Sequence, residues 1–263
     1  MQFTEVLAQI TAAAEQTIQL PEGWGQGRAL FGGLTAALAW QHAHHGVTAE
    51  QHLRAFTVSF VAPVQPGEAQ LIRRILRHGN NVTQVAVEIH QQQQVVLMAL
   101  ASYGRSRQSL VRVTDTVTTQ VPAREHGPSF PKSHLMPEFT HHFDYHLSVG
   151  AMPFSGQPLR EFGGWMRFSN EQQPITIGLL LGLVDAWPPA LLPHLKTPAP
   201  ASSLTWSIEF PQPLNTELMS SDWWQYSAYI DYAADGYGHT HAHIWDAQGQ
   251  LVAISRQTVT VFG

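Results

Sequence analysis

The sequence predicts an α+β protein in which two similar halves each curl an antiparallel sheet around one helix. A helix-like stretch is followed by four short β-like stretches, and this order recurs in the second half of the chain. Each half also carries a Phe-containing strand that runs into a proline turn, "SFVAPVQPG" and then "EFPQPLN". One helix covers a sheet only if the sheet curls round it, and two such halves side by side can share one continuous sheet.

The first half begins with the helix. Three glycines in "GWGQG" lead into "RALFGGLTAALAWQHAHHG", where Leu34, Ala37 and Leu38 keep a helical spacing and Gly46 supplies a stop. Strands are expected in "LRAFTVSFVAPVQPGE", "AQLIRRILRHG", "NVTQVAVEIHQ" and "QVVLMALASYG", which are rich in β-branched and aromatic residues. Turn-forming residues separate them, so we expect an antiparallel meander.

The second half repeats the pattern. We expect a helix over about 174–187 and strands in "SSLTWSIEFPQPLN", "WWQYSAYIDYA", "GYGHTHAHIWDAQG" and "QLVAISRQTVTVF". Residues 109–136 contain Pro, Ser and Thr without a clear period, which indicates a surface linker. The predicted halves are therefore 1–108 and 137–263.

Composition narrows the class of protein and of partner. The 263 residues include 13% charged side chains with a net charge of −5, so no basic surface for nucleic acid is expected. The absence of Cys excludes disulfides, zinc–thiolate sites and a cysteine nucleophile. The start lacks signal-peptide features and no apolar window approaches a span of about 20 residues. We expect a soluble, cytoplasmic protein without membrane insertion, and its low-charge strand faces favour a homodimer or higher homo-oligomer.

Asp185 is the unusual residue of "ITIGLLLGLVDAWPPALLP". In a helix it lies over Gly178 and beside Gly182. Each interior Gly costs about 1 kcal/mol relative to Ala, and a carboxylate in the last turn faces the negative end of the helix dipole. The two glycines and the carboxylate, each unfavourable for helix stability, lie on one side of the helix. Such a cluster is typical of residues kept for function. The alternative is a carboxylate that points to water at a frayed helix end.

The motifs in this order resemble the acyl-CoA thioesterase II type of double hotdog thioesterases. The resemblance rests on "RALFGG", "SFVAPVQPGE", "GLVDAWPPAL", "SSLTWSIEF" and "DAQGQLVAISRQ", and it covers about 20–104 and 140–263. It implies a double hotdog fold and hydrolysis of acyl-CoA to free fatty acid and CoA, with neither a metal nor an organic cofactor. It also implies that Asp185, Ser203 and Gln257 hold the attacking water, with Asp185 as general base.

Comparison of the two halves supports these residues. Aligning the helices and strands sets Ala39 opposite Asp185, Leu53 opposite Ser203, and Ser102 opposite Gln257. The polar groups thus belong to the second half, although Ser203 and Gln257 taken alone also fit ordinary strand positions. A carboxylate can accept the proton of water while a hydroxyl and an amide orient it. The α/β-hydrolase motif GxSxG is missing.

The first half is expected to stabilise the oxyanion. "LFGG" opens its helix with free backbone amides, and Gly32 and Gly33 permit close approach of a carbonyl. The same residues also fit a tight turn into a closely packed helix. Asn81, in "HGNN", is expected to have a supporting role because the family has a turn near its site.

The remaining alternatives concern His residues and the type of reaction. His239, His241 and His243 share one strand face, which fits a metal site, but Thr240, Ala242 and Ile244 form the apolar face, so we expect the histidines on the outside. A hotdog hydratase or dehydratase needs a His near its acid, and His194 lies beyond the two prolines. A non-catalytic acyl-CoA or lipid-binding hotdog protein also stays open.

Overall fold

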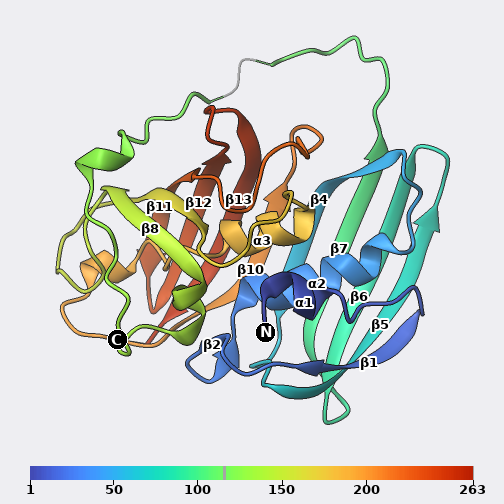
Figure 1. The fold of residues 1–263 in the computed structure, drawn as a ribbon, viewed down its shortest axis with the longest axis horizontal. Coiled ribbons are helices and arrows are strands. Elements are labelled where there is room, and N and C mark those ends of the chain that lie inside the picture. The colour runs from blue at the N-terminus through green and yellow to red at the C-terminus, as the bar shows by residue number, and fades with distance from the viewer. Residues whose placement is uncertain (115–116, 263) are drawn as a thin grey trace.

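The computed structural model describes residues 1–114 and 117–262. Its main feature is one antiparallel sheet of 11 strands in the order β1-β5-β6-β7-β4-β10-β13-β12-β11-β9-β8 (Figure 1). Beside it lies the two-stranded ribbon of β2 (Gly25–Gln26) and β3 (Ala29–Leu30). The strands of the large sheet are β1 (Glu15–Leu20), β4 (Gln51–Phe60), β5 (Gly67–His78), β6 (Val82–Gln91), β7 (Gln94–Arg105), β8 (Phe143–Val149), β9 (Glu161–Phe168), β10 (Ala201–Glu209), β11 (Trp224–Ala234), β12 (Tyr237–Trp245) and β13 (Leu251–Val261).

The helices lie in the hollow of this sheet. They are α1 (Phe3–Leu7), α2 (Gly32–His44) and α3 (Ile177–Val184), together with short 3₁₀ turns at Arg124–His126, Glu138–His142 and Leu192–His194. The helices α2 and α3 pack against each other across the junction of the two halves (Figure 1). Among the described residues, no helix has the length and apolarity needed to cross a bilayer. This arrangement confirms the predicted α+β class with one continuous sheet.

The two halves meet where β4 pairs with β10. From this junction the order reads β4-β7-β6-β5-β1 in one direction and β10-β13-β12-β11-β9 in the other, with β8 as an additional edge strand. Three irregularities of register also recur. They interrupt β4–β7 and β10–β13 at Leu53 and Ser203, β5–β6 and β11–β12 at Ile75 and Ile230, and β6–β7 and β12–β13 at Ile89 and Ile244. The duplication is therefore preserved in the bulges as well as in the order of strands.

The repeated bulges correct one part of the predicted alignment. Leu53 and Ser203 occupy equivalent positions, as predicted. Gln257, however, pairs with Trp206 three residues after Ser203, and the residue that pairs with the equivalent Phe56 is Ala101. The first-half counterpart of Gln257 is thus Ala101 and not Ser102. An alignment by composition misses this shift because both stretches are short runs of mostly small and apolar residues, and only the pairing with the neighbouring strand fixes the register to one residue.

The second helix is shorter than the predicted range of 174–187. It begins after Thr176, whose Oγ1 accepts a hydrogen bond from the Leu179 N–H at 3.2 Å. It ends before Asp185, which is the C-cap, and Pro188 and Pro189 follow shortly after. Asp185 therefore lies just beyond the helix rather than in its last turn.

Three outer strands of the large sheet were not predicted: the edge strands β1 and β8, and β9 beside β8. The sequence of β9, "EFGGWMRF", contains two adjacent glycines, which weaken a strand signal. The fold needs them because a Cβ on Gly163 would lie 2.1 Å from the Tyr226 carbonyl oxygen, and one on Gly164 would lie 2.0 Å from the His146 carbonyl oxygen. Close backbone packing thus explains the missed strand.

The segment between the halves is mostly exposed, but it is tied down at several points. Trp165 Nε1 donates to the Pro122 carbonyl at 2.8 Å, and Thr119 Oγ1 donates to Gln225 Oε1 at 2.7 Å. Phe130 is buried, with 8% of its surface exposed. The described part of this segment therefore packs on the second half, and the boundaries proposed at 108 and 137 stay predictions.

Candidate active site

Asp185 lies at the junction of the two halves, where the end of α3 meets the start of α2. Its backbone, with φ −95° and ψ 0°, terminates α3, and its N–H donates to the Leu181 carbonyl at 3.3 Å. A Cβ built on Gly32 would lie 2.8 Å from Asp185 Oδ2, and one on Gly33 would lie 3.1 Å from Asp185 Cβ. The carboxylate of the second half therefore contacts the helix N-terminus of the first, and only glycines leave room for it.

Gln257 is the polar partner of the acid. It lies on β13 opposite Trp206, whose side chain is fully buried on the helix-facing side of the sheet. Its Nε2 donates to Asp185 Oδ1 at 2.9 Å. The amide thus fixes one carboxylate oxygen, and two of the three residues expected to hold the water are in direct contact.

Burial raises the pKa of Asp185 to about 7, because the charged carboxylate is removed from bulk water. Hydrogen bonds from the Gln257 side chain and the Gly33 backbone amide favour the charged form and lower the pKa of Asp185, but they offset only part of this effect. Asp185 nevertheless keeps partial exposure, whereas Val184 and Ala186 are buried. Such a carboxyl group titrates near neutral pH, as a general base requires.

Ser203 lies on the same side of the sheet but without a direct bond to the acid. It pairs with Val259, which is fully buried and lies two residues after Gln257, so Ser203 and Gln257 face the same interior. Among the described residues, no hydrogen bond joins Ser203 to Asp185 or Gln257. Its predicted role therefore stays a prediction.

Asn81 is not brought to the other predicted residues. It lies in the turn between β5 and β6, where its carbonyl accepts a hydrogen bond from the Arg105 N–H at 3.0 Å. Four steps in the strand order separate β6 from β13. This turn also lies toward the C-terminal end of α2, since Gln51, shortly after that helix, donates from Nε2 to the Gly79 carbonyl at 3.0 Å. The 13 residues of α2 put its two ends about 20 Å apart. The sequence could not reveal this because it depends on which end of the helix meets the turn.

Aromatic residues beside the acid were missed. Tyr145 and Tyr226 are buried near Asp185, and burial, with a smaller effect from the negative charge of Asp185, raises the pKa of both hydroxyls. Trp187, two residues after the acid, is stacked on Tyr226 with ring centroids 5.8 Å apart. Tyr226 lies on β11, which was predicted as a strand, and Tyr145 lies on β8, whose alternating sequence "FDYHLSV" was a strand signal that the prediction overlooked.

The histidines of β12 lie on the outer side of the sheet, which confirms the predicted orientation. Thr240, Ala242 and Ile244 are buried, whereas His239, His241 and His243 are at least partly exposed. His241 Nδ1 lies 2.9 Å from Asp231 Oδ1. In the described part of the chain, no group of three or more His, Asp or Glu side chains is arranged to hold a metal ion.

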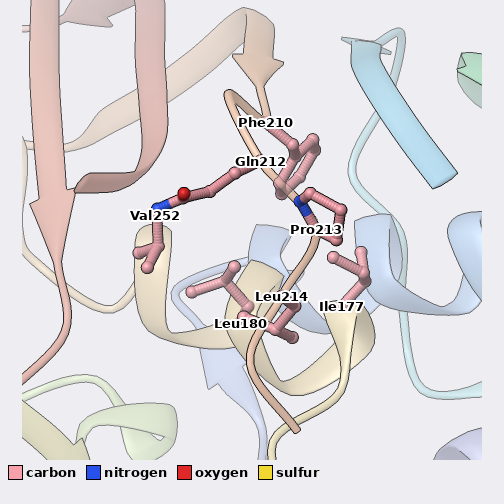
Figure 2. A pocket seen from close by; sticks show the side chains of 7 residues that line it. All are labelled: Ile177, Leu180, Phe210, Gln212, Pro213, Leu214 and Val252. Atoms are coloured by element: carbon pink, nitrogen blue, oxygen red, sulfur yellow. The ribbon is translucent and has the colours of Figure 1, made fainter. Parts of the chain in front are cut away.

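The equivalent junction at the other end of the two helices carries a tryptophan. A Cβ built on Gly178, near the start of α3, would lie 3.1 Å from a ring carbon of Trp40 on α2. Beside it, a small apolar hollow is lined by residues of α3, of the loop after β10 and of β13 (Figure 2), namely Ile177, Leu180, Phe210, Gln212, Pro213, Leu214 and Val252. The pseudo-symmetric position is thus packed with apolar side chains.

The alternative of a dehydratase-like acid–His pair receives no support from the geometry. His194 lies in the 3₁₀ turn that follows the prolines, and its Nε2 is 2.7 Å from the Leu159 carbonyl oxygen. Asp185 has Gln257 as its side-chain partner. The acid is therefore paired with an amide.

Comparison with known proteins agrees with this architecture. The family described as acyl-CoA thioesterase N-terminal domain matches residues 20–104, and the family described as acyl-CoA thioesterase C-terminal domain matches residues 108–261. A search of proteins with curated functions found no match.

Solved structures with the same fold cover nearly the whole chain. A conserved hot dog protein of unknown function from Alicyclobacillus acidocaldarius has a TM-score of 0.85 at 21% identity and covers 99% of this chain and 98% of its own. A putative thioesterase II from Thermobifida fusca YX has a TM-score of 0.81 at 17% identity, with coverage of 100% and 98%. The acyl-CoA thioesterase II TesB2 from Mycobacterium marinum has a TM-score of 0.78 at 16% identity, with coverage of 99% and 98%. The fold is a double hotdog, and the two domain matches establish that the chain belongs to the acyl-CoA thioesterase family.

Proposed function

We propose that this protein hydrolyses the thioester of an acyl-CoA to a free fatty acid and CoA, with Asp185 as general base. The observation that carries the proposal is the contact of Asp185 with both Gln257 and the α2 N-terminus, combined with a pKa of about 7. A base with a pKa near the working pH combines the ionised form with effective proton transfer. Membership of the acyl-CoA thioesterase family supports the same reaction class.

In the proposed reaction, Asp185 takes a proton from water while the water oxygen bonds to the acyl carbon. Gln257 and Ser203 orient this water by hydrogen bonds, so its lone pair faces the carbonyl. The tetrahedral intermediate then expels the sulfur of CoA, and the proton held by Asp185 passes to that sulfur. One water is consumed, the carbon–sulfur bond is replaced by a carbon–oxygen bond, and the Asp185 carboxylate is regenerated.

The oxyanion is proposed to bind at the N-terminus of α2. Phe31, the N-cap, offers no side-chain hydrogen bond to the first amides of the helix. The Gly33 amide already interacts with Asp185. The Gly32 amide is without a hydrogen bond among the described residues, so it is the donor still available. A helix N-terminus favours the negative charge that develops on the carbonyl oxygen.

The test is thiol release from a panel of acyl-CoA esters of different chain lengths at pH 8. We expect Asp185→Asn to lower kcat by about 100-fold or more, since general-base catalysis contributes about 10²–10⁴-fold. The control is Asp231→Asn, which removes a carboxylate from the outer side of the sheet and should leave the rate unchanged. Failure of the wild type to release thiol from any ester, or full activity of Asp185→Asn, would contradict the proposal.

Two further parts of the proposal concern the setting of the reaction. A fatty acid product suggests a role in fatty acid metabolism in the cytoplasm. The low-charge outer side of the sheet favours a homodimer or higher homo-oligomer, with Met98 and Leu100 exposed on β7. Light scattering of the purified protein at several concentrations measures the mass, and a monomer at all of them would contradict this part.

A further inference from the structure

The position of Asp185 depends on contacts outside its helix. α3 has only eight residues, and Asp185 follows its last one. Beyond that point the backbone is held by the Asp185 N–H, at 3.3 Å from the Leu181 carbonyl, and by the Ala186 N–H, at 3.1 Å from the Leu183 carbonyl. The end of so short a helix frays unless tertiary contacts fix it. The carboxylate must nevertheless stay in contact with Gly32 and Gln257.

The first tertiary contact is a hydrogen bond to the residue next to the acid. The hydroxyl of Tyr145, on β8, donates to the Ala186 carbonyl oxygen at 3.0 Å. Tyr145 is 4% exposed and Ala186 is fully buried. A carbonyl at the end of a helix has no partner within the helix, and leaving it unpaired in the interior costs about 1–3 kcal/mol. This bond therefore ties the end of α3 to the far edge of the sheet.

The second set of contacts is the packing of aromatic rings around Trp187, the residue after Ala186. The indole of Trp187 has four aromatic rings around it, from Phe162, Phe130, Tyr145 and Tyr226, with centroids 5.3, 5.5, 5.6 and 5.8 Å from its own. Its Nε1 is buried without a hydrogen-bond partner among the described residues. Trp187 is thus held by ring packing rather than by a polar contact, and such aromatic pairs favour specific geometries.

One of these rings comes from the segment that joins the two halves. The Phe130 N–H donates to the Tyr145 carbonyl at 3.2 Å, and the Leu147 N–H donates to the Pro128 carbonyl at 2.9 Å. Residues 128–130 therefore run along the free edge of β8. This pairing fixes the Phe130 ring 5.4 Å from Tyr145 and against Trp187.

We infer that Trp187 and the four rings around it form an aromatic clamp that positions Asp185 for catalysis, with Tyr145 and Phe130 as its positioning residues. The inference rests on the proposed function, since it assigns these residues to the reaction of Asp185. The clamp residues hold Ala186 and Trp187, the two residues that follow the acid. Their effect is transmitted through the orientation and solvation of the carboxylate.

The first variant is Tyr145→Phe, which keeps the ring and removes the hydrogen bond to Ala186. We expect kcat to fall about 10-fold, with a smaller change in KM, because misplacement of a catalytic group by about 1 Å is costly. A looser helix end also admits water to the carboxylate, so its pKa should fall from about 7. The acid limb of the pH–rate profile should move to lower pH with it.

The matched control is Tyr103→Phe. Tyr103 is as deeply buried, with 1% exposure, but it lies on β7 in the first half beside His44. This variant should keep both the kcat and the pH profile of the wild type. Equal kcat values for the two Tyr→Phe variants, with unchanged acid limbs, would overturn the inference.

A second variant, Phe130→Ala, tests the part played by the connecting segment. It should lower kcat and shift the acid limb in the same direction as Tyr145→Phe, whereas Phe130→Leu, which refills the space, should restore most of both. If Phe130→Ala lowers activity only in proportion to its unfolded fraction, measured by near-UV circular dichroism, the clamp has a merely structural role and the inference fails.

An activity-independent measurement separates this inference from the proposed function. The ¹³C resonance of the Asp185 carboxyl, assigned by its loss in Asp185→Asn, is titrated in the wild type and in Tyr145→Phe. A lower pKa in the variant supports the clamp even if the wild type hydrolyses no thioester, in which case only the proposed function fails. Identical titrations in the two proteins contradict the clamp whatever the activity.

Discussion

Asp185 is an unfavourable residue for the stability of its surroundings. It lies at the C-terminal end of a helix, where the dipole disfavours negative charge, and burial raises its pKa to about 7. Gln257 and the Gly33 amide stabilise the ionised form, although not enough to restore an ordinary carboxyl pKa. The local cost noted in the sequence therefore has a physical origin in the folded protein, and it produces the basicity that the proposed reaction uses.

The raised pKa of Asp185 predicts how the free energy of unfolding depends on pH. The carboxyl pKa is about 7 in the folded chain and about 3.9 in the unfolded chain. The folded state therefore retains the proton more strongly, so the contribution of Asp185 to stability is fully present below about pH 4, is lost progressively as pH rises to about 7, and stays lost above it. At 1.36 kcal/mol per pKa unit the ionised acid costs at most about 4 kcal/mol. Asp185→Asn should thus raise the free energy of unfolding at pH 8 by about 1–3 kcal/mol, measured by urea titration, with little change at pH 4.

Asp144 supplies a control of opposite sign. Hydrogen bonds and charges from Lys132 and Arg167 lower its pKa despite partial burial. Its contribution to stability is therefore present above the unfolded-state pKa and lost as pH falls through the folded-state value. Asp144→Asn should destabilise the protein at pH 8. If Asp185→Asn is also destabilising at pH 8, Asp185 is a structural ion rather than a strained base.

The candidate site was predictable to different degrees for different residues. Asp185 could be identified because its environment is visible in one helix: glycines, a late position and two prolines. Gln257 and the glycines followed from the resemblance, and the structure brings them into contact with the acid. Asn81 could not be judged because its distance depends on strand order, whereas Tyr145 was missed although its strand, "FDYHLSV", alternates apolar and polar residues.

At the scale of the elements, the N-terminus of α2 gives a second testable prediction, because it has no room for a Cβ at Gly32. Gly32 lies in the first turn, where Ala is usually the better helix former. A Cβ here would come within 2.8 Å of Asp185 Oδ2 and 3.2 Å of the Phe60 ring. Gly32→Ala should therefore displace the carboxylate and lower kcat/KM by about 100-fold, while the melting temperature changes little. Steady-state kinetics at pH 8 and thermal unfolding measure the two quantities.

Gly46→Ala is the matched control at the opposite end of the same helix. The nearest atom to a Cβ at Gly46 is 3.4 Å away, an ordinary contact, so activity should be unchanged. If Gly32→Ala is as active as Gly46→Ala, the carboxylate does not work from the α2 N-terminus.

The central strands were predicted and the outer strands β1, β8 and β9 were not, for reasons that differ between the strands. β4–β7 and β10–β13 are buried on one side by α2 and α3, and their sequences alternate or run apolar accordingly. β1 and β9 pair on the outer sides of β5 and β11, and β8 closes one end of the sheet. β1 buries only two of its six residues and β9 contains adjacent glycines, so their patterns are weak, whereas the alternation of β8 was a strand signal that the prediction overlooked. Missing these strands matters for the site, because β8 and β9 carry two of the four rings around Trp187, those of Tyr145 and Phe162.

At the scale of the whole molecule, duplication has produced two equivalent junctions of which one carries the acid. At one junction, Asp185 lies against the glycines at the start of α2; at the other, Trp40 lies against Gly178 near the start of α3. Trp40 is 6% exposed, and its ring stacks on His44 with centroids 5.2 Å apart. The second junction therefore serves packing, and it holds the same two helices in register for the first.

Because the second junction serves packing, Trp40→Ala should lower the free energy of unfolding and leave kcat unchanged. Removing a buried Trp typically costs about 3–5 kcal/mol, so the urea midpoint should fall sharply. The remaining folded protein should keep the wild-type kcat, because the acid, Gln257 and the α2 N-terminus are untouched. Trp223→Ala is the matched control: Trp223 lies between the Arg124 and Arg167 guanidinium groups, 4.8 and 4.6 Å from its ring, and should cost only about 1 kcal/mol. A loss of kcat without loss of stability in Trp40→Ala would mean that the two junctions are both catalytic, contrary to the asymmetry of their side chains.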